Sequence, residues 1–206
     1  MGQQYEDYYD QKTVQEYLDW TQLWVQACKE ALRSTGSMFV FINDALVSEV
    51  DVLIKSLGFH PRSKIVWYYT FGQNTQGNFT PSHTNILYYS KHKTKRTWNG
   101  DDPQCRIPSA RQLVYKDKRA NPAGRLPDNT WILYPHLLPE GSFNPLGDTW
   151  LESRVAGTFN ARRAHSPNQL PQPLVDRIVL LTSSAGDLVV DPFVGTGTTG
   201  LSCVDH

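Results

Sequence analysis

The sequence contains no run of 18 apolar residues, which is about the length that a membrane-spanning helix requires. Its first residues carry Gln3, Gln4, Glu6, Asp7 and Asp10, so they are polar and acidic. A signal peptide would begin with basic residues and continue with an apolar stretch. Both absences predict a protein that neither crosses a membrane nor is secreted.

Cysteine is scarce, because the three residues Cys28, Cys105 and Cys203 are far apart and odd in number. A disulfide framework needs paired cysteines, and a structural metal site typically needs closely spaced ones. The cysteine content therefore argues against both and predicts a reducing, cytoplasmic compartment with no bound metal.

An overall excess of charge is also missing, because 20 Lys and Arg balance 20 Asp and Glu. The balance hides a local bias between residues 91 and 125, where ten Lys or Arg and three Asp leave a net charge of +7. Such a stretch suits a polyanion whose phosphates it would neutralise. A solvated, charged loop region explains the same composition, and charge alone leaves both readings open.

The length of 206 residues fits one domain, and the hydrophobic content of 39% supports a packed core. Helical and strand-like patterns alternate along the chain, which predicts an α/β sheet. The predicted helices cover 13–35, 44–57 and 171–183, and the predicted strands cover 37–43, 64–70, 84–89 and 188–190.

Several residues predict where the first two helices begin and end. Thr13 and Glu16 have the spacing of a capping box. Gly36 and Gly58 predict the C-terminal stops. Asp44 follows a strand end, where α/β folds place functional side chains, but it fits a helix cap equally well.

The region 91–148 is rich in Pro and Gly and shows no sustained periodicity. Loops of this length are uncommon inside a compact domain and are usually functional or disordered. An inserted recognition region fits better than a linker, because large apolar side chains could anchor it. These are Trp98, Tyr115, Trp131, Ile132 and Leu133.

The segment 187–203 places an apolar stretch, a glycine turn and a helix start in succession. Gly195 and Gly197 let a ligand approach the backbone, and the N–H groups of a helix beginning at Thr198 favour an anionic group. No lysine follows the second glycine, so the segment is not a phosphate-binding P-loop. The pattern predicts a small-ligand site near residue 197.

Three features together resemble the DNA amino-methyltransferases that act on N4 of cytosine or N6 of adenine. The first is DPFVGTGTT at 191–199, which looks like their S-adenosylmethionine motif, and the second is the block 149–190 ahead of it. The third is the pair Phe79 and His83 ahead of a strand, followed by a basic variable stretch. The chain is most similar to the class whose catalytic half precedes the cofactor motif.

The resemblance implies a Rossmann-like α/β sheet with helices on both faces and a permuted motif order. It divides the chain into a catalytic-side half at 1–90, a target-recognition insert at 91–148 and a cofactor-binding segment at 149–206. Its prokaryotic or phage-type relatives imply double-stranded DNA as partner and allow a companion restriction endonuclease. The oligomeric state is left open.

The resemblance also implies site residues. The S-adenosylmethionine pocket would be lined by Asp191, Pro192, Phe193, Gly195, Gly197, Thr198 and Thr199, and on its other side by His165, Asn168 and Pro171. Contacts to DNA would come from Phe79, His83, Lys93, Lys95, Arg96, Arg106 and Arg111. A structural role remains open for His165, Phe79 and His83.

The implied reaction is direct methyl transfer to an exocyclic amine of a base turned out of the duplex. The family's catalytic tetrapeptide, Asp or Ser followed by Pro-Pro and an aromatic residue, does not occur in the sequence. Its usual place would be just before Gly2, and a ribose-binding acid would lie beyond His206. We therefore expect an internal fragment with an incomplete sheet, inactive by itself.

Two other functions fit the same residues. A degenerate relative would bind DNA or cofactor without catalysis, and an RNA methyltransferase would use a similar pocket. The sequence does not distinguish adenine from cytosine as the target base.

Overall fold

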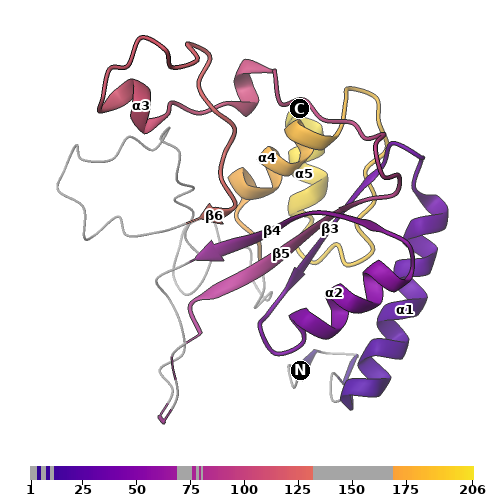
Figure 1. The fold of residues 1–206 in the computed structure, drawn as a ribbon. Helices are drawn as coiled ribbons and strands as arrows, with labels where there is room; N and C mark the ends of the chain where they lie inside the picture. The colour runs from indigo at the N-terminus through magenta and orange to yellow at the C-terminus, as the bar shows by residue number, and fades with distance from the viewer. Residues whose placement is uncertain are drawn as a thin grey trace. The chain divides into compact units, whose positions relative to one another are not determined.

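The structure is a computed structural model that describes residues 4–5, 8–9, 12–68, 76–77, 79, 81–131 and 169–206 (Figure 1). The chain divides into two compact units. The first unit comprises Met1–Lys64 and Asn85–Arg96, and the second comprises Ile65–Thr84 and Thr97–His206. No helix in the described ranges is long and apolar enough to span a bilayer.

The main sheet has the strand order β3-β5-β4-β6. Its strands are β3 (Ser37–Ile42), β5 (His83–Ser90), β4 (His60–Tyr68) and β6 (Thr130–Trp131). β3 pairs antiparallel with β5, and β4 pairs parallel with β6, so the sheet is mixed. A second, two-stranded ribbon joins β1 (Gln4–Tyr5) to β2 (Tyr8–Tyr9).

The helices of the first unit are α1 (Val14–Ala31) and α2 (Val47–Ser56), which lie side by side (Figure 1). The predicted capping box is confirmed, because Glu16 N donates to Thr13 Oγ1 (3.2 Å) and Thr13 N donates to Glu16 Oε2 (2.8 Å). The predicted stop at Gly36 is wrong, since the helix already ends at Leu32, whose backbone is extended.

The start of α2 also differs from the prediction, which placed it at Asp44. The Asp44 carboxylate accepts a hydrogen bond from Asn85 Nδ2 (2.6 Å), and Asn43 Oδ1 holds a turn by accepting from Ala45 N (3.2 Å). The helix therefore begins at Val47, three residues later, without a side-chain cap. The predicted stop at Gly58 is confirmed by its φ of 79°.

The core of the first unit lies between these two helices and the paired strands β3 and β5. Its fully buried members include Val25 of α1, Val50 and Ile54 of α2, and Leu87 and Tyr89 of β5. Burying an aliphatic or aromatic side chain of this size stabilises a fold by about 1.5–3 kcal/mol. Apolar packing therefore holds α1 and α2 against the paired strands.

A polar pair closes one side of this core and gives a pH-dependence that can be measured. Tyr89 Oη donates to Asp51 Oδ1 (2.5 Å), and burial together with this hydrogen bond raises the pKa of Tyr89 well above its ordinary value. A raised pKa in the folded state means that stability is present below the unfolded pKa, about 10, and is lost as the pH rises beyond it.

We expect Tyr89→Phe to make the alkaline loss of stability shallower by about one proton, or ~1.4 kcal/mol per pH unit. Urea unfolding at neutral pH and at a series of values above about pH 9 would measure the slope for both proteins. Parallel curves for the two proteins would contradict the assignment.

The second unit contains the helices α4 (Gln172–Thr182) and α5 (Thr198–Asp205), which also lie side by side (Figure 1). Leu174 and Val175 are buried on α4, and Gln172 Nε2 donates to Asp205 Oδ2 across the pair (2.6 Å).

The part of 91–148 that is described is mostly irregular, with only η1 (Pro103–Cys105), α3 (Ala110–Leu113) and β6.

This irregular region is attached to α4 by Asn99. The Nδ2 group of Asn99 donates to Leu180 O (2.7 Å) and Ser183 O (2.6 Å), and Asn99 N donates to Leu181 O (2.9 Å). The last carbonyl groups of a helix lack N–H donor partners inside the helix, so the donors of Asn99 complete the C-terminal end of α4.

The predicted anchor Tyr115 is wrong, because this residue is 77% exposed, and Trp98 is 37% exposed. Cys105 and Ile107 are buried in this region instead. The prediction relied on large aromatic side chains being buried more often than exposed, which does not hold for Tyr115. The anchoring role of Trp131 stays a prediction. Ile132 and Leu133 lie outside the described residues.

The strand predicted at 188–190 is not observed. Among the described residues none pairs with this segment, and Leu188 and Val190 are 83% and 65% exposed. A strand requires a hydrogen-bonded neighbour, which hydrophobic composition alone does not supply.

Candidate functional site

The turn that follows residue 190 is built around the Asp191 carboxylate. Its Oδ1 accepts from Phe193 N (3.0 Å), and its Oδ2 accepts from the Thr199 hydroxyl (2.7 Å). One side chain thereby ties the beginning of the turn to the first turn of α5. A carboxylate has about four acceptor positions, so Asp191 keeps capacity for a ligand donor.

Two glycines give this turn its shape. Gly195 has φ 50° and Gly197 has φ 77°, a left-handed region that side chains other than Gly rarely adopt. In the described part of the chain, nothing beyond Gly197 and its adjoining backbone lies within 4 Å of the position that a Cβ on Gly197 would occupy. The backbone at the start of α5 can therefore be approached closely by a ligand.

Gly197 is the N-cap of α5 and offers no side-chain acceptor to the first N–H groups of the helix. Those groups and the helix dipole favour an anionic group such as a ligand carboxylate. The hydroxyls of Thr196 and Thr198 lie 3.3 Å apart at the same end. The predicted start of the helix at Thr198 is confirmed.

The segment before α4 meets the start of α5. The Thr198 hydroxyl donates to Leu170 O (3.4 Å), and the neighbouring Pro171 is the buried N-cap residue of α4. The structure therefore brings Pro171 near the glycine turn, as expected from the two blocks of sequence. His165 and Asn168, which were predicted on the same side, lie outside the described residues.

The basic loop, residues 91–96, belongs to the first unit and is held by an arginine that the sequence did not single out. Arg62 donates to Ser90 Oγ (2.7 Å) and to the carbonyls of His92 (2.8 Å) and Lys93 (2.5 Å). His92 Nδ1 accepts from the backbone N–H groups of Thr94 and Lys95, both at 3.1 Å. A single arginine among exposed neighbours gives no sequence signal for this role.

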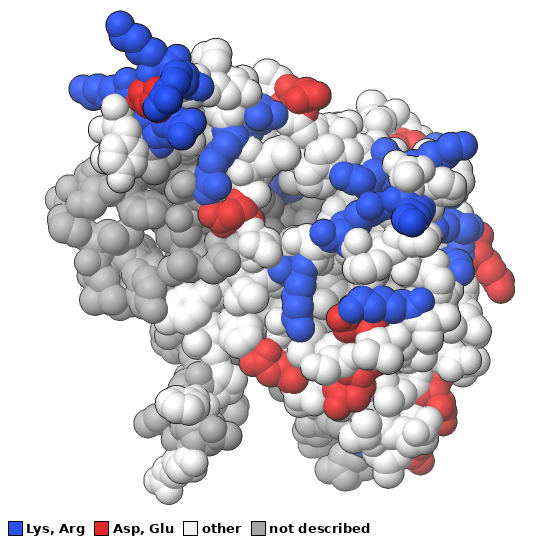
Figure 2. All heavy atoms as spheres, in the orientation of Figure 1, with Lys and Arg blue, Asp and Glu red and all other residues white. Residues whose placement is uncertain are grey.

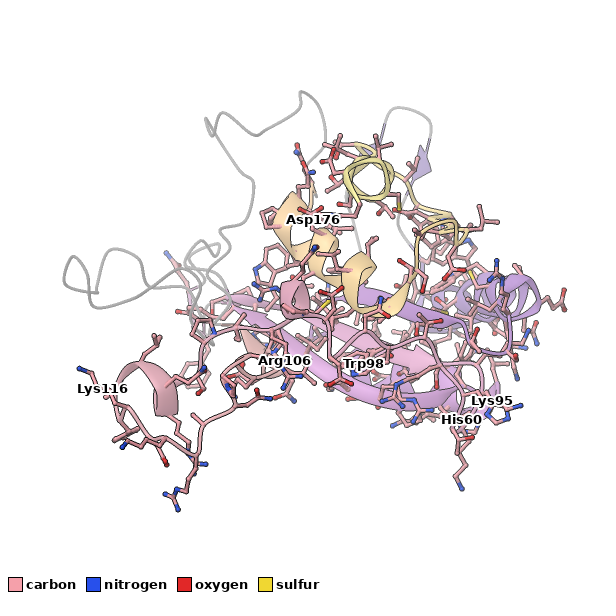
Figure 3. All side chains as sticks on the ribbon, turned by 90° about the horizontal axis from the view of Figure 1, so that it is seen from above. His60, Lys95, Trp98, Arg106, Lys116 and Asp176 are labelled. Carbon is pink, nitrogen blue, oxygen red and sulfur yellow. The ribbon has the colours of Figure 1, made fainter. Side chains whose placement is uncertain are left out.

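The basic loop directs its charges outward. Lys93, Lys95 and Arg96 are exposed, so the three residues predicted to contact DNA here are accessible. Figure 3 shows Lys95 on this loop. Their contact with DNA stays a prediction.

Arg106 has a structural role within the second unit. Its side chain is only 15% exposed, and its guanidinium donates to Gly100 O (2.5 Å) and Gly124 O (3.2 Å). Two of its five N–H donors are thus bonded to backbone carbonyls, and its contact with DNA stays a prediction.

The remaining predicted DNA contacts are differently placed. The side chain of Arg111 is 60% exposed and lies 3.5 Å from Asp117 Oδ2, and Phe79 is 94% exposed. His83 is the partly buried first residue of β5. Lys and Arg side chains gather over the α3 end of the second unit (Figure 2).

A cavity of about 220 Å³ in the first unit carries cations but is not assigned a ligand. Lys55 on its wall pairs with Asp51 (2.6 Å), and Arg62 holds the basic loop. Hydrogen bonds from Lys55 and Tyr89 keep the pKa of Asp51 below its ordinary value although its burial acts to raise it. The charged groups of Asp51, Lys55 and Arg62 therefore interact with other groups of the protein itself.

The sequence is similar to those of known DNA methyltransferases. The profile of a family described as DNA methylase, N6_N4_Mtase, matches residues 1–205. Type II methyltransferase M.HpaI of Haemophilus parainfluenzae is 30% identical over 204 residues, covering 98% of this chain and 57% of the relative. DNA adenine methyltransferase YhdJ of Escherichia coli (strain K12) is 28% identical, covering 89% and 58%. The chain spans little more than half the length of these relatives.

Two solved structures have the same fold. The PvuII DNA methyltransferase (cytosine-N4-specific) superposes with a TM-score of 0.64 at 16% identity, covering 98% of this chain and 67% of that one. The M1.HpyAVI-SAM complex superposes with a TM-score of 0.51 at 18% identity, covering 94% and 73%. The predicted α/β class is confirmed, while the permuted order of motifs stays a prediction. The chain is a member of the N6_N4_Mtase family of DNA methylases.

Proposed function

We propose that this protein transfers a methyl group from S-adenosylmethionine to an exocyclic amine in double-stranded DNA, either N6 of adenine or N4 of cytosine. The observation that carries the proposal is the Asp191 carboxylate, which holds the glycine turn open at the N-terminus of α5. This chain belongs to the N6_N4_Mtase family. Its turn offers a carboxylate for the ammonium group and helix N–H groups for the carboxylate of a methionine-like zwitterion.

The residues that we propose for the cofactor site form two walls. The first wall, at the glycine turn, consists of Asp191, Pro192, Phe193, Gly195, Gly197, Thr198 and Thr199. Pro171 belongs to the opposite wall, for which we also propose His165 and Asn168. When bound, S-adenosylmethionine supplies an electrophilic methyl group on a sulfonium.

The side chains at the turn have distinct tasks in this proposal. The first N–H groups of α5, which begins at Thr198, orient the carboxylate of the methionine end. Asp191 fixes the turn and keeps an acceptor position for the ligand's ammonium or hydroxyl groups. Phe193, which is 53% exposed, offers an aromatic face to the positively charged part of the ligand.

DNA approaches through the irregular region at 91–148, which we propose as the target-recognition insert. Residues 1–90 are the catalytic-side half and residues 149–206 the cofactor segment of the same domain. A restriction endonuclease acting at the same DNA sequence stays a prediction.

Transfer of labelled methyl groups tests the function, using the protein at its full natural length with duplex DNA and tRNA as alternative acceptors. We expect label in DNA, recovered after digestion as N6-methyladenine or N4-methylcytosine, which also identifies the target base. Label in tRNA alone would support an RNA methyltransferase instead. DNA binding without transfer would support a catalytically inactive remnant.

A further inference from the structure

The tip loop, residues 108–124, is closed at its base by a two-residue bridge. Ile107 and Arg125 exchange both backbone hydrogen bonds, each 2.8 Å long. Gly124 has φ 87°, and a Cβ on it would lie 2.3 Å from Ile107 O. The bridge therefore requires a glycine at this position, and it separates the tip loop from the rest of the insert.

Asp117 organises the interior of the tip loop. Its backbone N–H donates to Arg111 O (3.0 Å), and its carboxylate accepts from Arg119 Nε (3.1 Å) and Nη2 (3.0 Å). Hydrogen bonds from the Arg119 side chain and backbone lower the pKa of Asp117. Exposed ion pairs add little stability, but together with the backbone bonds they define one conformation for residues 111–119.

This ordered segment presents apolar side chains to solvent. Leu113, Val114 and Tyr115 are consecutive and are 48%, 70% and 77% exposed. Lys116, which follows them, has φ 48° and is the one non-glycine residue with a positive φ in the described ranges. A contiguous exposed apolar group is a mark of an interaction site, and a strained residue held in place by its surroundings points to function.

Cations surround these apolar side chains. Between 111 and 119, four positive residues and Asp117 leave a net charge of +3, and the positive residues are Arg111, Lys116, Lys118 and Arg119. Figure 3 shows Lys116 at the outer end of this loop, away from Arg106 and Asp176 of the same unit. Cations beside an exposed aromatic ring suit a nucleic acid, because phosphates are neutralised while bases stack on the ring or meet apolar groups.

We propose that the tip loop is the base-reading element of the insert, with Val114 and Tyr115 contacting bases of duplex DNA and Lys116, Lys118 and Arg119 contacting the adjacent phosphates. The inference rests on the proposed function, whose substrate it specifies further. The basic loop at 91–96 contains no apolar residue, so its cations position the duplex without reading it.

The test begins by mapping methylated bases in the genome of a methylation-free bacterial host that expresses the unaltered protein at its full natural length, which reveals the recognition sequence. The kcat/KM of each variant is then measured on a duplex with that sequence and on duplexes with one base pair changed. The variants are Tyr115→Ala, Tyr115→Phe, Val114→Ser, the triple change Lys93→Ala, Lys95→Ala and Arg96→Ala, and Leu23→Ala as an exposed apolar control on α1.

For Tyr115→Ala we expect kcat/KM on the recognition sequence to fall about tenfold or more, because one base loses its stacking partner. Discrimination against changed base pairs falls with it, while the salt dependence of DNA binding is kept. Tyr115→Phe retains the ring and the discrimination, and Leu23→Ala leaves both unchanged. The triple change weakens all duplexes alike and flattens the salt dependence.

Unchanged discrimination in both Tyr115→Ala and Val114→Ser, with normal melting temperatures, would overturn the assignment of the tip loop and leave the proposed function standing. An unaltered protein that methylates no DNA would overturn the proposed function, and this inference with it.

Discussion

Replacing Asp191 with alanine is expected to weaken the binding of S-adenosylhomocysteine, the product form of the cofactor, by about 10- to 100-fold. The change removes both the acceptor of Phe193 N and the acceptor of the Thr199 hydroxyl. Each hydrogen bond to a charged group contributes about 1.5–3 kcal/mol, and here their loss releases the turn that presents the α5 N-terminus. Isothermal titration calorimetry measures the dissociation constant directly.

Two further variants separate the carboxylate from its surroundings. Thr199→Val keeps the side-chain shape but removes one donor to Asp191, so we expect a smaller loss of affinity in the same direction. Asp205→Asn changes a carboxylate at the other end of the same helix, where its partner is Gln172, and serves as the matched control. Equal affinities for Asp191→Ala and the unaltered protein would remove Asp191 from the cofactor site.

Replacing Asn99 is expected to destabilise the second unit. Asn99→Ala leaves Leu180 O and Ser183 O without their side-chain donor, which costs about 1–3 kcal/mol in a partly buried setting. For a chain of this size, each kcal/mol lowers the melting temperature by roughly 2–4 °C. We therefore expect a decrease of about 2–12 °C, measured by calorimetry or circular dichroism.

The chemistry of the Asn99 contact gives the prediction a direction as well as a size. Asn99→Asp replaces the donor with a carboxylate that faces two carbonyl oxygens. We therefore expect it to lower the melting temperature more than Asn99→Ala does, and by less at low pH, where the carboxylate is protonated. Asn121→Ala is the control, because Asn121 lies on an exposed turn of the same insert and its side-chain oxygen accepts from Ala123 N of that turn. Equal melting temperatures for the two alanine variants would exclude the proposed anchor.

Local signals in the sequence were sufficient where the interaction itself is local. The Thr13 and Glu16 capping box joins groups three residues apart, and the α4 helix and the glycine turn at 195–197 likewise follow from neighbouring residues. These elements are therefore predicted to within a few residues.

Signals failed where a partner distant in the sequence decides the outcome. Asp44 does not cap α2, because Asn85 donates to its carboxylate, and the Arg106 guanidinium donates to Gly100 O and Gly124 O. Composition placed Arg106 among ten similar cations and could not distinguish a guanidinium bonded within the protein from an exposed one. The role of Arg62 in holding the basic loop was missed for the same reason.

The bridge between Ile107 and Arg125 has a consequence for engineering. A loop whose two ends are already joined can change length and sequence at a small entropic cost, because closure entropy grows only slowly with the number of residues. Residues 108–123 could therefore be exchanged as a cassette, provided that Gly124 and the bridging pair are kept. New DNA specificities would then be sought by replacing one surface segment, without redesigning the cofactor turn.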